Sequence, residues 1–399
     1  MKNSTDKQTK VGIITFHFPY NCGAMLQCYA LQTALERKGY GAEVINYVPW
    51  YHRNRYTPFK NPFQFAAQRS QKAKENGKSA VTGWADGFGR AVYSWRRWKQ
   101  IMPREKRFNR FMNTNLHLTR VYRTLEQLQK NPPKAQAYVA GSDQLWNAHI
   151  TEGKFDEAYF LRFGGKDVRR LSYAMGADFA EVAEPEKELP ALLDKMDAIS
   201  LRENKCWDPV RKSAPENVPM HLCVDPTLLL PAEVYNAIEE KPENAPEKFI
   251  LTYVMPNESA FKVFGGARAM AEKTGLPVID VNGNPLAINR KIEDNRICSP
   301  GEFLWYVNHA SYVFTNSFHG TVFSVIYHKQ FMTIPHSAFG NRTSELLEKL
   351  NLGQRLAVSG PQAASRIENP VDYQAVDRRV EELRSDSLNY LWENLPPVR

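Results

Sequence analysis

The chain opens with a strand–helix–strand pattern that occupies residues 11–47. Residues 11–16 form a short apolar run typical of a buried parallel strand, residues 24–38 are expected to form a helix, and residues 42–47 the next strand. Gly39 is expected to end the helix, because glycine adopts the left-handed conformation without a steric penalty. Two parallel strands joined by a helix are the repeating unit of layered α/β sheets, so the chain is predicted to begin with an α/β domain.

The alternation of strands and helices continues in two series. Strands of the first series are expected at residues 137–140, 170–174, 198–202 and 221–224, and those of the second at residues 249–254, 277–280, 312–315 and 331–335. A Pro- and Glu-rich segment at residues 239–248 is predicted to link the two series. Because 399 residues exceed what one core usually serves, we predict two Rossmann-like domains that face each other across a cleft, residues 1–240 and 241–399. The last thirty residues are expected to form a helix that packs back across both domains.

A basic insertion, residues 51–110, interrupts the first series. It carries fifteen Lys and Arg against three Asp and Glu. This excess of positive charge is larger than the net charge of +9 of the whole chain. Aromatic residues are interleaved with these charges, namely Phe63, Phe65, Trp84, Trp95 and Trp98. Such a surface suits nucleic acid, an anionic membrane face, or an acidic glycan or lipid phosphate. The alternative is a solvated helical insertion without a partner.

Composition limits the compartment and the cofactors. No run of 18 apolar residues occurs, and residues 1–10 are polar, so neither a transmembrane helix nor a signal peptide is predicted, and the protein is expected in the cytoplasm. The five cysteines include no CxxC pair and the nine histidines are scattered, so neither disulfides nor a metal site is expected. Cys22 stands just before a predicted helix, where a thiolate is favoured. No Gly-x-Gly-x-x-Gly follows the first strand, which argues against a dinucleotide cofactor.

The strongest candidate site lies at residues 315–321, where an apolar strand ends in a polar cluster and a helix follows, which is expected to begin at Thr321. Backbone N–H groups at a helix N-terminus suit a phosphate. His319 could donate to that anion and also move a proton near neutral pH. The flanking residues expected to bind substrate are Asn316, Ser317, Gly320 and Thr321. The alternative is that Ser317 only caps the helix and His319 is a structural residue.

Two arginines are candidates for gripping the same anion. Arg202 ends a predicted strand, and its guanidinium fork can bind phosphate or carboxylate in a bidentate manner. The alternative is a surface charge pair between Arg202 and Glu203. Arg342 stands near the start of a predicted helix and could reach the cleft as a substrate-binding residue, although an exposed arginine is the more common case.

Residues 141–147 follow another predicted strand and form a Gly-flanked turn. Asp143 in this turn could take a proton from an attacking hydroxyl group. Trp146 offers a flat face of the kind on which sugars stack, and Gln144 is expected to help bind the substrate. The alternative is an Asx-type turn with Trp146 in the core.

Two further segments are weaker candidates. His17, Asn21 and Gly23 lie beside the N-terminus of the first predicted helix and could bind a second anion or the acceptor. Asp225 is followed by Pro226 and is interpreted as part of a turn that stops a strand.

Six motifs occur in one order along the chain. They are NCGAMLQ (21–27), GSDQLWN (141–147), SYA (172–174), ISLRE (199–203), DPTLL (225–229) and SFHGTVFS (317–324). In this order they resemble the polysaccharide pyruvyl transferase family. Cys22 stands where that family usually has an aromatic residue, and Asn316 stands where Asp is frequent.

The resemblance implies a GT-B-like fold, with the acceptor on the first domain and the donor on the second. It implies transfer of the enolpyruvyl group of phosphoenolpyruvate onto a sugar of a surface polysaccharide or its lipid-linked repeat unit, as a pyruvate ketal. Phosphoenolpyruvate carries a phosphate and a carboxylate, which Arg202 and the helix N-terminus at His319 could grip. His319 is then expected to act as the acid and Asp143 as the base. The donor is a substrate, so neither a cofactor nor a metal is required.

Expected partners are therefore phosphoenolpyruvate and a glycan or lipid-linked oligosaccharide, with peripheral contact to an anionic inner leaflet and no nucleic acid. Two alternatives stay open. The first is a GT-B-type nucleotide-sugar glycosyltransferase, in which Asp280 or Glu302 could hold a ribose. The second is a non-enzymatic protein that binds nucleic acid or a membrane through residues 51–110, for which His319 would be irrelevant.

Overall fold

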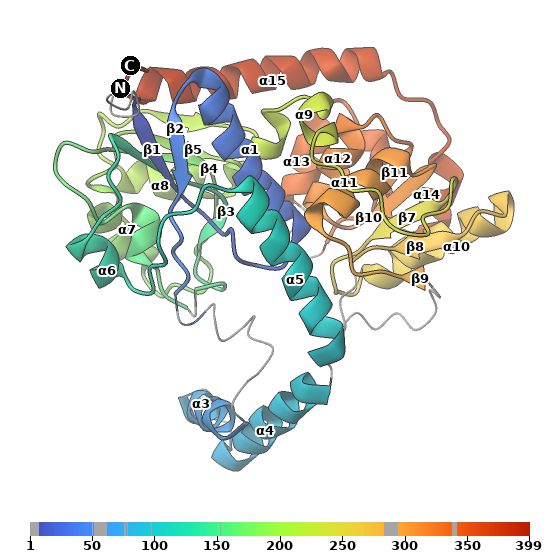
Figure 1. Ribbon diagram of the computed structural model, residues 1–399, viewed down its shortest axis with the longest axis horizontal. Coiled ribbons are helices and arrows are strands. Elements are labelled where there is room, and N and C mark those ends of the chain that lie inside the picture. Colours follow the sequence, from blue (N-terminus) through green and yellow to red (C-terminus); the bar gives the residue numbers. More distant parts are fainter. Residues whose placement is uncertain are drawn as a thin grey trace, which may run out of the picture.

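Two parallel β-sheets, one in each half of the chain, form the framework of the protein (Figure 1). The structure is a computed structural model that describes residues 8–49, 51, 62–75, 77, 79–96, 98–151, 153–282, 294–336 and 341–399. The predicted architecture of two Rossmann-like domains is confirmed. The expected boundary at residues 240/241 falls between the last strand of the first sheet and the first strand of the second.

The first sheet has six strands in the order β2-β1-β3-β4-β5-β6. These are β1 (Lys10–Ile14), β2 (Gly41–Val44), β3 (Ala137–Asn147), β4 (Arg169–Asp178), β5 (Ile199–Leu201) and β6 (Met220–Leu222). Helix α1 (Cys22–Lys38) connects β1 to β2, which pair in parallel, as the sequence predicts. Asn21 caps its N-terminus by accepting from Ala24 N, and Gly39 ends it at φ 107°. Helices α6 (Leu125–Lys130), α7 (Pro185–Leu193) and α8 (Trp207–Ser213) complete this domain.

The second sheet has five strands in the order β11-β10-β7-β8-β9. These are β7 (Ile250–Tyr253), β8 (Val278–Asp280), β9 (Asp294–Asn295), β10 (Tyr312–Thr315) and β11 (Phe331–Thr333). Helix α9 (Ala232–Asn236) lies in the connection between the two sheets, and the helices that follow β7 are α10 (Ala260–Thr274), α11 (Pro300–His309), α12 (Phe318–Ile326), α13 (Asn341–Lys349) and α14 (Gly360–Arg366). The carboxyl end of β10 leads directly into α12, so the candidate segment 315–321 lies at that edge of the sheet.

One hydrophobic core runs through the junction of the two domains. It joins side chains of α1 and the first sheet to side chains of α11, α12 and the second sheet. The ring of Tyr235 in α9 lies 5.0 Å from that of Phe323 in α12 and 6.5 Å from that of Tyr29 in α1. Because this junction is apolar and continuous, the domains are held in one arrangement around the site.

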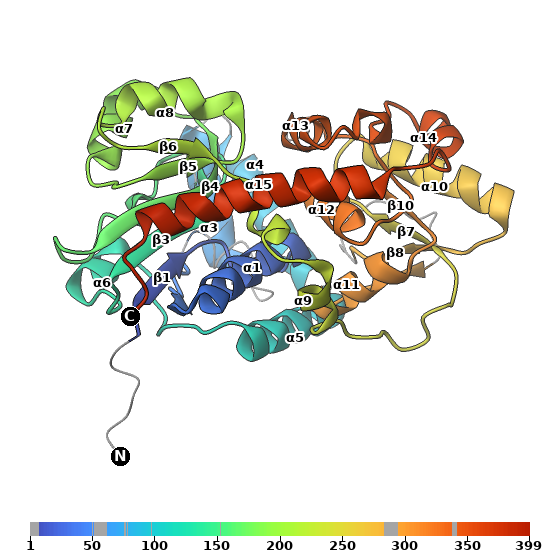
Figure 2. The same cartoon turned by 90° about the horizontal axis from the view of Figure 1, so that it is seen from above.

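Helix α15 (Tyr373–Asn394) crosses both domains on one side of the molecule, as predicted (Figures 1 and 2). Tyr390 Oη donates to Ser172 O at 2.9 Å in the first domain, and Tyr373 Oη donates to Lys329 O at 2.5 Å in the second. Beyond the helix the chain returns to its beginning, where Tyr40 Oη donates to Pro396 O at 2.9 Å. The two ends of the described chain therefore lie side by side (Figure 1).

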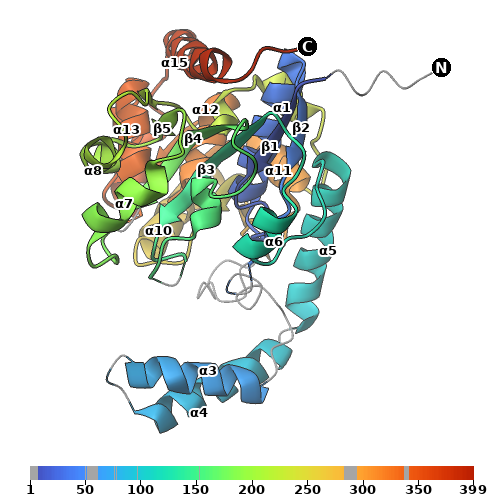
Figure 3. The same cartoon turned by 90° about the vertical axis from the view of Figure 1, so that its left-hand side faces the viewer.

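The basic insertion is helical, with α3 (Pro62–Glu75), α4 (Ala80–Arg96) and α5 (Trp98–Asn115); residues 52–61 lie outside the described part of the chain. Helix α5 runs along the body of the molecule, whereas α3 and α4 lie side by side away from both sheets (Figures 1 and 3). Within the described residues, none of the helices is long and apolar enough to cross a membrane.

Two local expectations are wrong. Residues 141–147 are not a turn, because β3 continues through them and still pairs with β4, with a register irregularity between Asp143 and Trp146. Leu145 and Trp146 are apolar and buried, so the strand continues into the core. Helix α12 begins at Phe318 instead of Thr321, because Ser317 caps it by accepting a hydrogen bond from Gly320 N. His319 therefore lies in the first turn of a helix.

Candidate functional site

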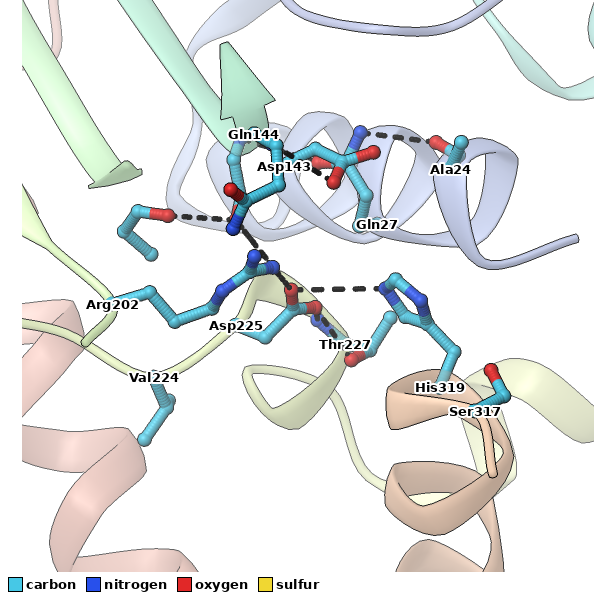
Figure 4. A network of polar contacts seen from close by, with 12 residues as sticks. Ala24, Gln27, Asp143, Gln144, Arg202, Val224, Asp225, Thr227, Ser317 and His319 are labelled. Carbon is cyan, nitrogen blue, oxygen red and sulfur yellow. Dashed lines mark hydrogen bonds and ion pairs between the residues drawn. The ribbon is translucent and has the colours of Figure 1, made fainter. Parts of the chain in front are cut away.

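A buried carboxylate, Asp225, joins side chains from both domains (Figure 4). Arg202 Nη1 donates to Asp225 Oδ2 at 2.7 Å, and His319 Nε2 lies 3.7 Å from the same oxygen. Thr227 donates to Oδ1 through its backbone N–H and its hydroxyl group, at 3.1 and 2.7 Å. Arg202 follows β5 of the first domain and His319 belongs to α12 of the second, so Asp225 fixes two residues that are distant in the sequence.

The charges of this cluster are stabilised mutually. Burial by itself would raise the pKa of Asp225, but His319, Arg202 and Thr227 hold that pKa well below its usual range. Burial would likewise lower the pKa of Arg202, but Glu203, Asp225 and Asp143 raise it above its ordinary value. Arg202 Nε also donates to Glu203 Oε1 at 2.9 Å. Both Arg202 and Asp225 therefore stay charged although they are buried.

Two buried donor groups keep hydrogen-bonding capacity for a ligand. Arg202 Nη2 and His319 Nε2 are both buried and make no hydrogen bond within the protein. The ionised Asp225 carboxylate favours the His319 tautomer that carries the proton on Nε2. Because a buried donor without a partner costs free energy, such groups are usually met by a ligand or water. One donor from each domain can thus grip an anion at the domain junction.

A second arginine joins Arg202 around an aromatic ring. The guanidinium carbons of Arg202 and Arg342 lie 5.0 and 5.1 Å from the centre of the Phe318 ring. Burial first, and then the like charge of Arg202, lower the pKa of Arg342, while Glu203 and Asp143 act in the opposite direction. The structure thus brings Arg342 into the site, and the two cations suit a ligand with two anionic groups.

The N-terminus of α1 meets the His319 ring from the first domain. A Cβ atom on Gly23 would lie 2.1 Å from His319 Nδ1, so only glycine allows this approach. Nearby, Cys22 Sγ lies 3.9 Å from Cys298 Sγ of the second domain. Cys22 is buried against this neighbour, so it is not the accessible thiol that its place in the sequence favours.

A polar network positions Asp143 at the carboxyl end of the first sheet. Gln27 of α1 accepts from Ser142 N at 3.2 Å and donates to Thr15 Oγ1 at 2.9 Å, and Thr15 donates to Ser142 O at 2.9 Å. Asp143 is partly buried and has φ 77°, a region that residues other than glycine rarely adopt. Its Oδ1 accepts from Gln144 N at 2.9 Å. Such local strain often accompanies a functional position.

Comparison with known proteins agrees with this geometry. A sequence profile of the polysaccharide pyruvyl transferase family matches residues 21–337. The chain belongs to the polysaccharide pyruvyl transferase family. It is therefore a transferase of polysaccharide biosynthesis, and the match includes Asp143, Arg202, Asp225 and His319. No curated protein matches the sequence of this transferase.

Solved structures resemble the transferase in fold. A putative UDP-N-acetylglucosamine 2-epimerase from Listeria monocytogenes has a TM-score of 0.49 at 10% identity, covering 96% of this chain and 94% of that chain. The glycosyltransferase SnogD from Streptomyces nogalater has a TM-score of 0.40 at 12% identity, covering 98% of this chain and 96% of that chain. The arrangement of two parallel sheets under a crossing C-terminal helix is the GT-B-like fold expected from the sequence.

Two residues expected to bind substrate belong to the core of the transferase instead. Trp146 is fully buried, donates from Nε1 to Tyr159 O at 3.0 Å and stacks on Phe160, so it presents no face to a sugar. His17 is also fully buried; its ring nitrogens pair with Thr15 O at 3.1 Å and Asn46 Oδ1 at 3.0 Å. Burial lowers the pKa of His17, which keeps the ring neutral. Both residues shape the first domain.

The residues around His319 support its position. Asn316 accepts from Met255 N at 2.6 Å and donates to Met255 O at 2.9 Å, which ties β10 to the loop after β7. Thr321 Oγ1 donates to Ser317 O at 3.0 Å, and a Cβ atom on Gly320 would lie 2.4 Å from the hydroxyl oxygen of Thr315. These side chains form the turn that carries His319, and their polar groups make hydrogen bonds within that turn.

Two positions expected to bind substrate lie at the edges of the cluster. Gln144 Nε2 donates to Glu203 Oε1 at 3.5 Å, beside Arg202. The side-chain nitrogen of Asn21 lies 3.9 Å from the sulfur of Met255 in the second domain. In the part of the chain that the structure describes, no group of three His, Cys, Asp or Glu is placed to hold a metal ion.

The residue that the sequence interpretation misses is Asp225. It was assigned to a turn because a proline follows it, and it does cap the short 3-10 helix Pro226–Leu228. The same side chain also neutralises Arg202 across the first domain. A carboxylate at the end of a strand, in a chain with an arginine at the end of the neighbouring strand, is the signal that could have identified it.

Proposed function

We propose that this transferase moves the enolpyruvyl group of phosphoenolpyruvate onto a sugar of a surface polysaccharide or its lipid-linked repeat unit, forming a pyruvate ketal. The observation that carries the proposal is the pair of buried donors, Arg202 Nη2 and His319 Nε2, on either side of Asp225. They come from different domains, and each can still donate a hydrogen bond to an anion at the domain junction.

Phosphoenolpyruvate fits the charges of the site. Its carboxylate would lie between Arg202 and Arg342, whose guanidinium groups flank the Phe318 ring. Its phosphate would be held by His319 in the first turn of α12, where the helix dipole also favours negative charge. Asp225 is a positioning residue, because it fixes the Arg202 fork at 2.7 Å and lies 3.7 Å from His319 Nε2.

The proposed reaction has two additions at C2. His319 delivers a proton to the methylene carbon, which makes C2 electrophilic, and the first sugar hydroxyl group adds there while Asp143 takes its proton. The bond from C2 to the phosphate oxygen then breaks, and phosphate leaves. A second hydroxyl group of the same sugar adds to the resulting oxocarbenium carbon and closes the ketal ring. The released phosphate takes its proton, and the proton that Asp143 took returns through solvent to His319, so protons and bonds balance without a further reactant.

The acceptor of the proposed reaction is a glycan or a lipid-linked oligosaccharide. For the lipid-linked form we propose that the protein works in the cytoplasm with peripheral contact to the anionic inner leaflet. The fifteen basic residues of the insertion support this proposal. Nucleic acid is not expected as a partner.

The alternative is a nucleotide-sugar glycosyltransferase, and one residue favours it. Asp280 ends β8 of the second domain and is buried, where a carboxylate could hold a ribose. Thr252 Oγ1 already donates to Asp280 Oδ1 at 3.0 Å within the protein, so the observation is weaker than the one at Arg202 and His319.

One assay separates the two reactions. Purified protein is incubated with phosphoenolpyruvate or with UDP-sugars, together with candidate glycan acceptors, and phosphate release and acceptor mass are measured. Acceptor-dependent phosphate release with a ketal on the acceptor supports the proposal, whereas release of nucleoside diphosphate overturns it. His319→Ala and Arg202→Ala should nearly abolish turnover; wild-type rates in both would remove the assigned site.

A further inference from the structure

The α3–α4 hairpin carries an exposed aromatic cluster. Trp84 stacks on Phe88 with ring centres 5.3 Å apart, and Phe63 of α3 meets Phe88 edge-on at 5.7 Å. Val81, Trp84 and Phe88 recur at helical spacing, so they share one side of α4. Phe63 is 68% exposed, Val81 77% and Trp84 41%. Exposed large apolar side chains grouped in this way indicate an interaction surface.

The two helices pack closely through two glycines of α4. A Cβ atom on Gly83 would lie 2.6 Å from Ala73 Cβ, and one on Gly87 would lie 2.7 Å from Ala66 Cα. Glycines four residues apart thus bring α4 directly against the α3 backbone. This close approach leaves Phe63, Val81 and Trp84 exposed to solvent.

The hairpin is positively charged. Residues 62–96 contain six Lys and Arg against two Asp and Glu. Asp86 is paired with both Arg69 and Arg90 at 2.7 Å, so its charge is already neutralised. An aromatic cluster beside a basic excess matches the interface of an anionic bilayer, where Trp and Phe enter the headgroup region and Lys and Arg are attracted to lipid phosphates.

Helix α5 fixes the hairpin to the domain junction. Arg104 Nη2 donates to Tyr20 O of the first domain at 2.6 Å, and Arg104 Nη1 donates to Asn282 O of the second. Arg107 pairs with Glu302 of α11. Helix α5, which follows the hairpin in the chain, is therefore anchored at the domain junction.

We propose that the α3–α4 hairpin docks the protein on an anionic lipid membrane through Phe63, Val81 and Trp84. The benefit of docking, access to a lipid-linked acceptor, rests on the proposed function, whereas the docking itself does not require turnover. In the docked protein the hairpin lies on the membrane surface, and the rest of the protein stays in water.

A fluorescent label tests the surface directly. All five cysteines of the chain are buried, so Val81→Cys provides one accessible thiol for an environment-sensitive dye. Val358→Cys, at a position 74% exposed outside the hairpin, is the matched control. Vesicles of phosphatidylcholine with about one third phosphatidylglycerol should shift the Val81→Cys emission to the blue and increase it at least about two-fold, while Val358→Cys is unchanged. Pure phosphatidylcholine vesicles should give a weaker response.

Three variants examine the chemistry of docking by vesicle flotation. Phe63→Ser with Trp84→Ser should abolish flotation, whereas Phe261→Ser, at a position 65% exposed in α10, should not. Lys74→Glu reverses an exposed charge without touching the helix contact and should weaken binding to anionic vesicles roughly 10-fold. Circular dichroism verifies that each variant keeps its helix content.

The outcomes separate this proposal from its rivals. No response of Val81→Cys to vesicles, or an equal response of Val358→Cys, overturns it. A change in Val81→Cys emission with protein concentration alone assigns the surface to a second copy of the chain, and binding of duplex DNA with vesicle binding absent assigns it to nucleic acid. Pyruvyl transfer to a soluble glycan is measured in parallel. Pyruvyl transfer without vesicle binding would overturn only the docking proposal. Vesicle binding without pyruvyl transfer would overturn only the proposed function.

Discussion

Arg202 Nη1 and Asp225 Oδ2 form a 2.7 Å ion pair in which both side chains are buried. The pair lies at the junction of the two domains, beside His319. Removing one partner of a buried ion pair is strongly destabilising, and here Glu203 beside Arg202 and His319 beside Asp225 would compensate the remaining charge only in part. The pair thus couples the stability of the junction to the geometry of the site.

Asp225→Asn should lower both activity and acid sensitivity. Removing one partner of a buried ion pair costs about 3 kcal/mol or more, so the melting temperature should fall. The pKa of Asp225 in the folded protein is below its ordinary value, so the stability it contributes is present above about pH 4 and is lost as pH falls through the lowered pKa. Unfolding free energy measured from pH 2 to 7 should fall toward acid in the wild type and be flatter in the variant. Equal slopes would contradict the assignment.

Gly23→Ala should inactivate the enzyme without unfolding it. The added methyl group would meet His319 Nδ1 at 2.1 Å and displace the ring. A shift of about 1 Å at a reacting group lowers kcat/KM about 100-fold. Gly265→Ala in α10 is the control, because its methyl group meets nothing within 4 Å. Comparable rates for Gly23→Ala and wild type would show that His319 is not held by this contact.

Arg202→Lys should raise the KM for phosphoenolpyruvate although the charge is kept. Arg202 uses Nε for Glu203 and Nη1 for Asp225, and a lysine cannot make both contacts while it also binds a ligand. A loss of about 100-fold in kcat/KM is expected. Arg342→Lys should also raise KM, and the double variant should lose less than the product of the two effects, because both cations act on one donor molecule. Fully multiplicative losses would place the two arginines on separate ligands.

Asp143→Asn should lower kcat while the fold is retained. Asparagine also adopts positive φ, so the backbone at φ 77° is accommodated and the melting temperature should stay near that of the wild type. Loss of a general base lowers kcat about 100-fold or more. A kcat close to that of the wild type would show that Asp143 is not the base.

Asp280→Asn should stabilise the protein in mild alkali. Burial raises the pKa of Asp280 to about 7, although Thr252 and Asn282 act in the opposite direction. A carboxyl group with a raised pKa lowers the stability of the folded protein as pH rises from the pKa of the unfolded state, about 4, to the folded pKa of about 7. The loss of stability is complete above pH 7. The variant should therefore melt a few degrees higher than the wild type at pH 8 and equally at pH 4. A benefit that is the same at both pH values would contradict a buried charge at this position.

Much of the fold could be predicted from local pattern. Gly39 and Gly275 end α1 and α10 in the left-handed conformation, as their positions after the last apolar residues suggest. The extension of β3 through residues 141–147 could not be predicted, because Gly141 and Asp143 have the composition of a turn. Only pairing with β4, which is distant in sequence, holds them in a strand.

The site was predictable one residue at a time, but its assembly was not. Arg202 and His319 each stand at the end of a strand, where α/β sheets place ligands. Their common partner Asp225 meets Arg202 through the pairing of β5 with β6, but it meets His319 only through the packing of the two domains, which no local pattern encodes. Trp146 is the opposite case, because the sequence places it at the site whereas the structure buries it in the core. The reason is that the strand continues through this residue.

The C-terminal segment that returns to the beginning of the chain has a consequence for synthesis. Thr9 Oγ1 donates to Pro397 O at 2.9 Å, and Tyr40 Oη donates to Pro396 O, so residues next to β1 and β2 pair with residues that are translated long after them. Domains usually fold in the order in which they are translated. These contacts of the first domain can therefore form only after the second domain and α15 have been synthesised.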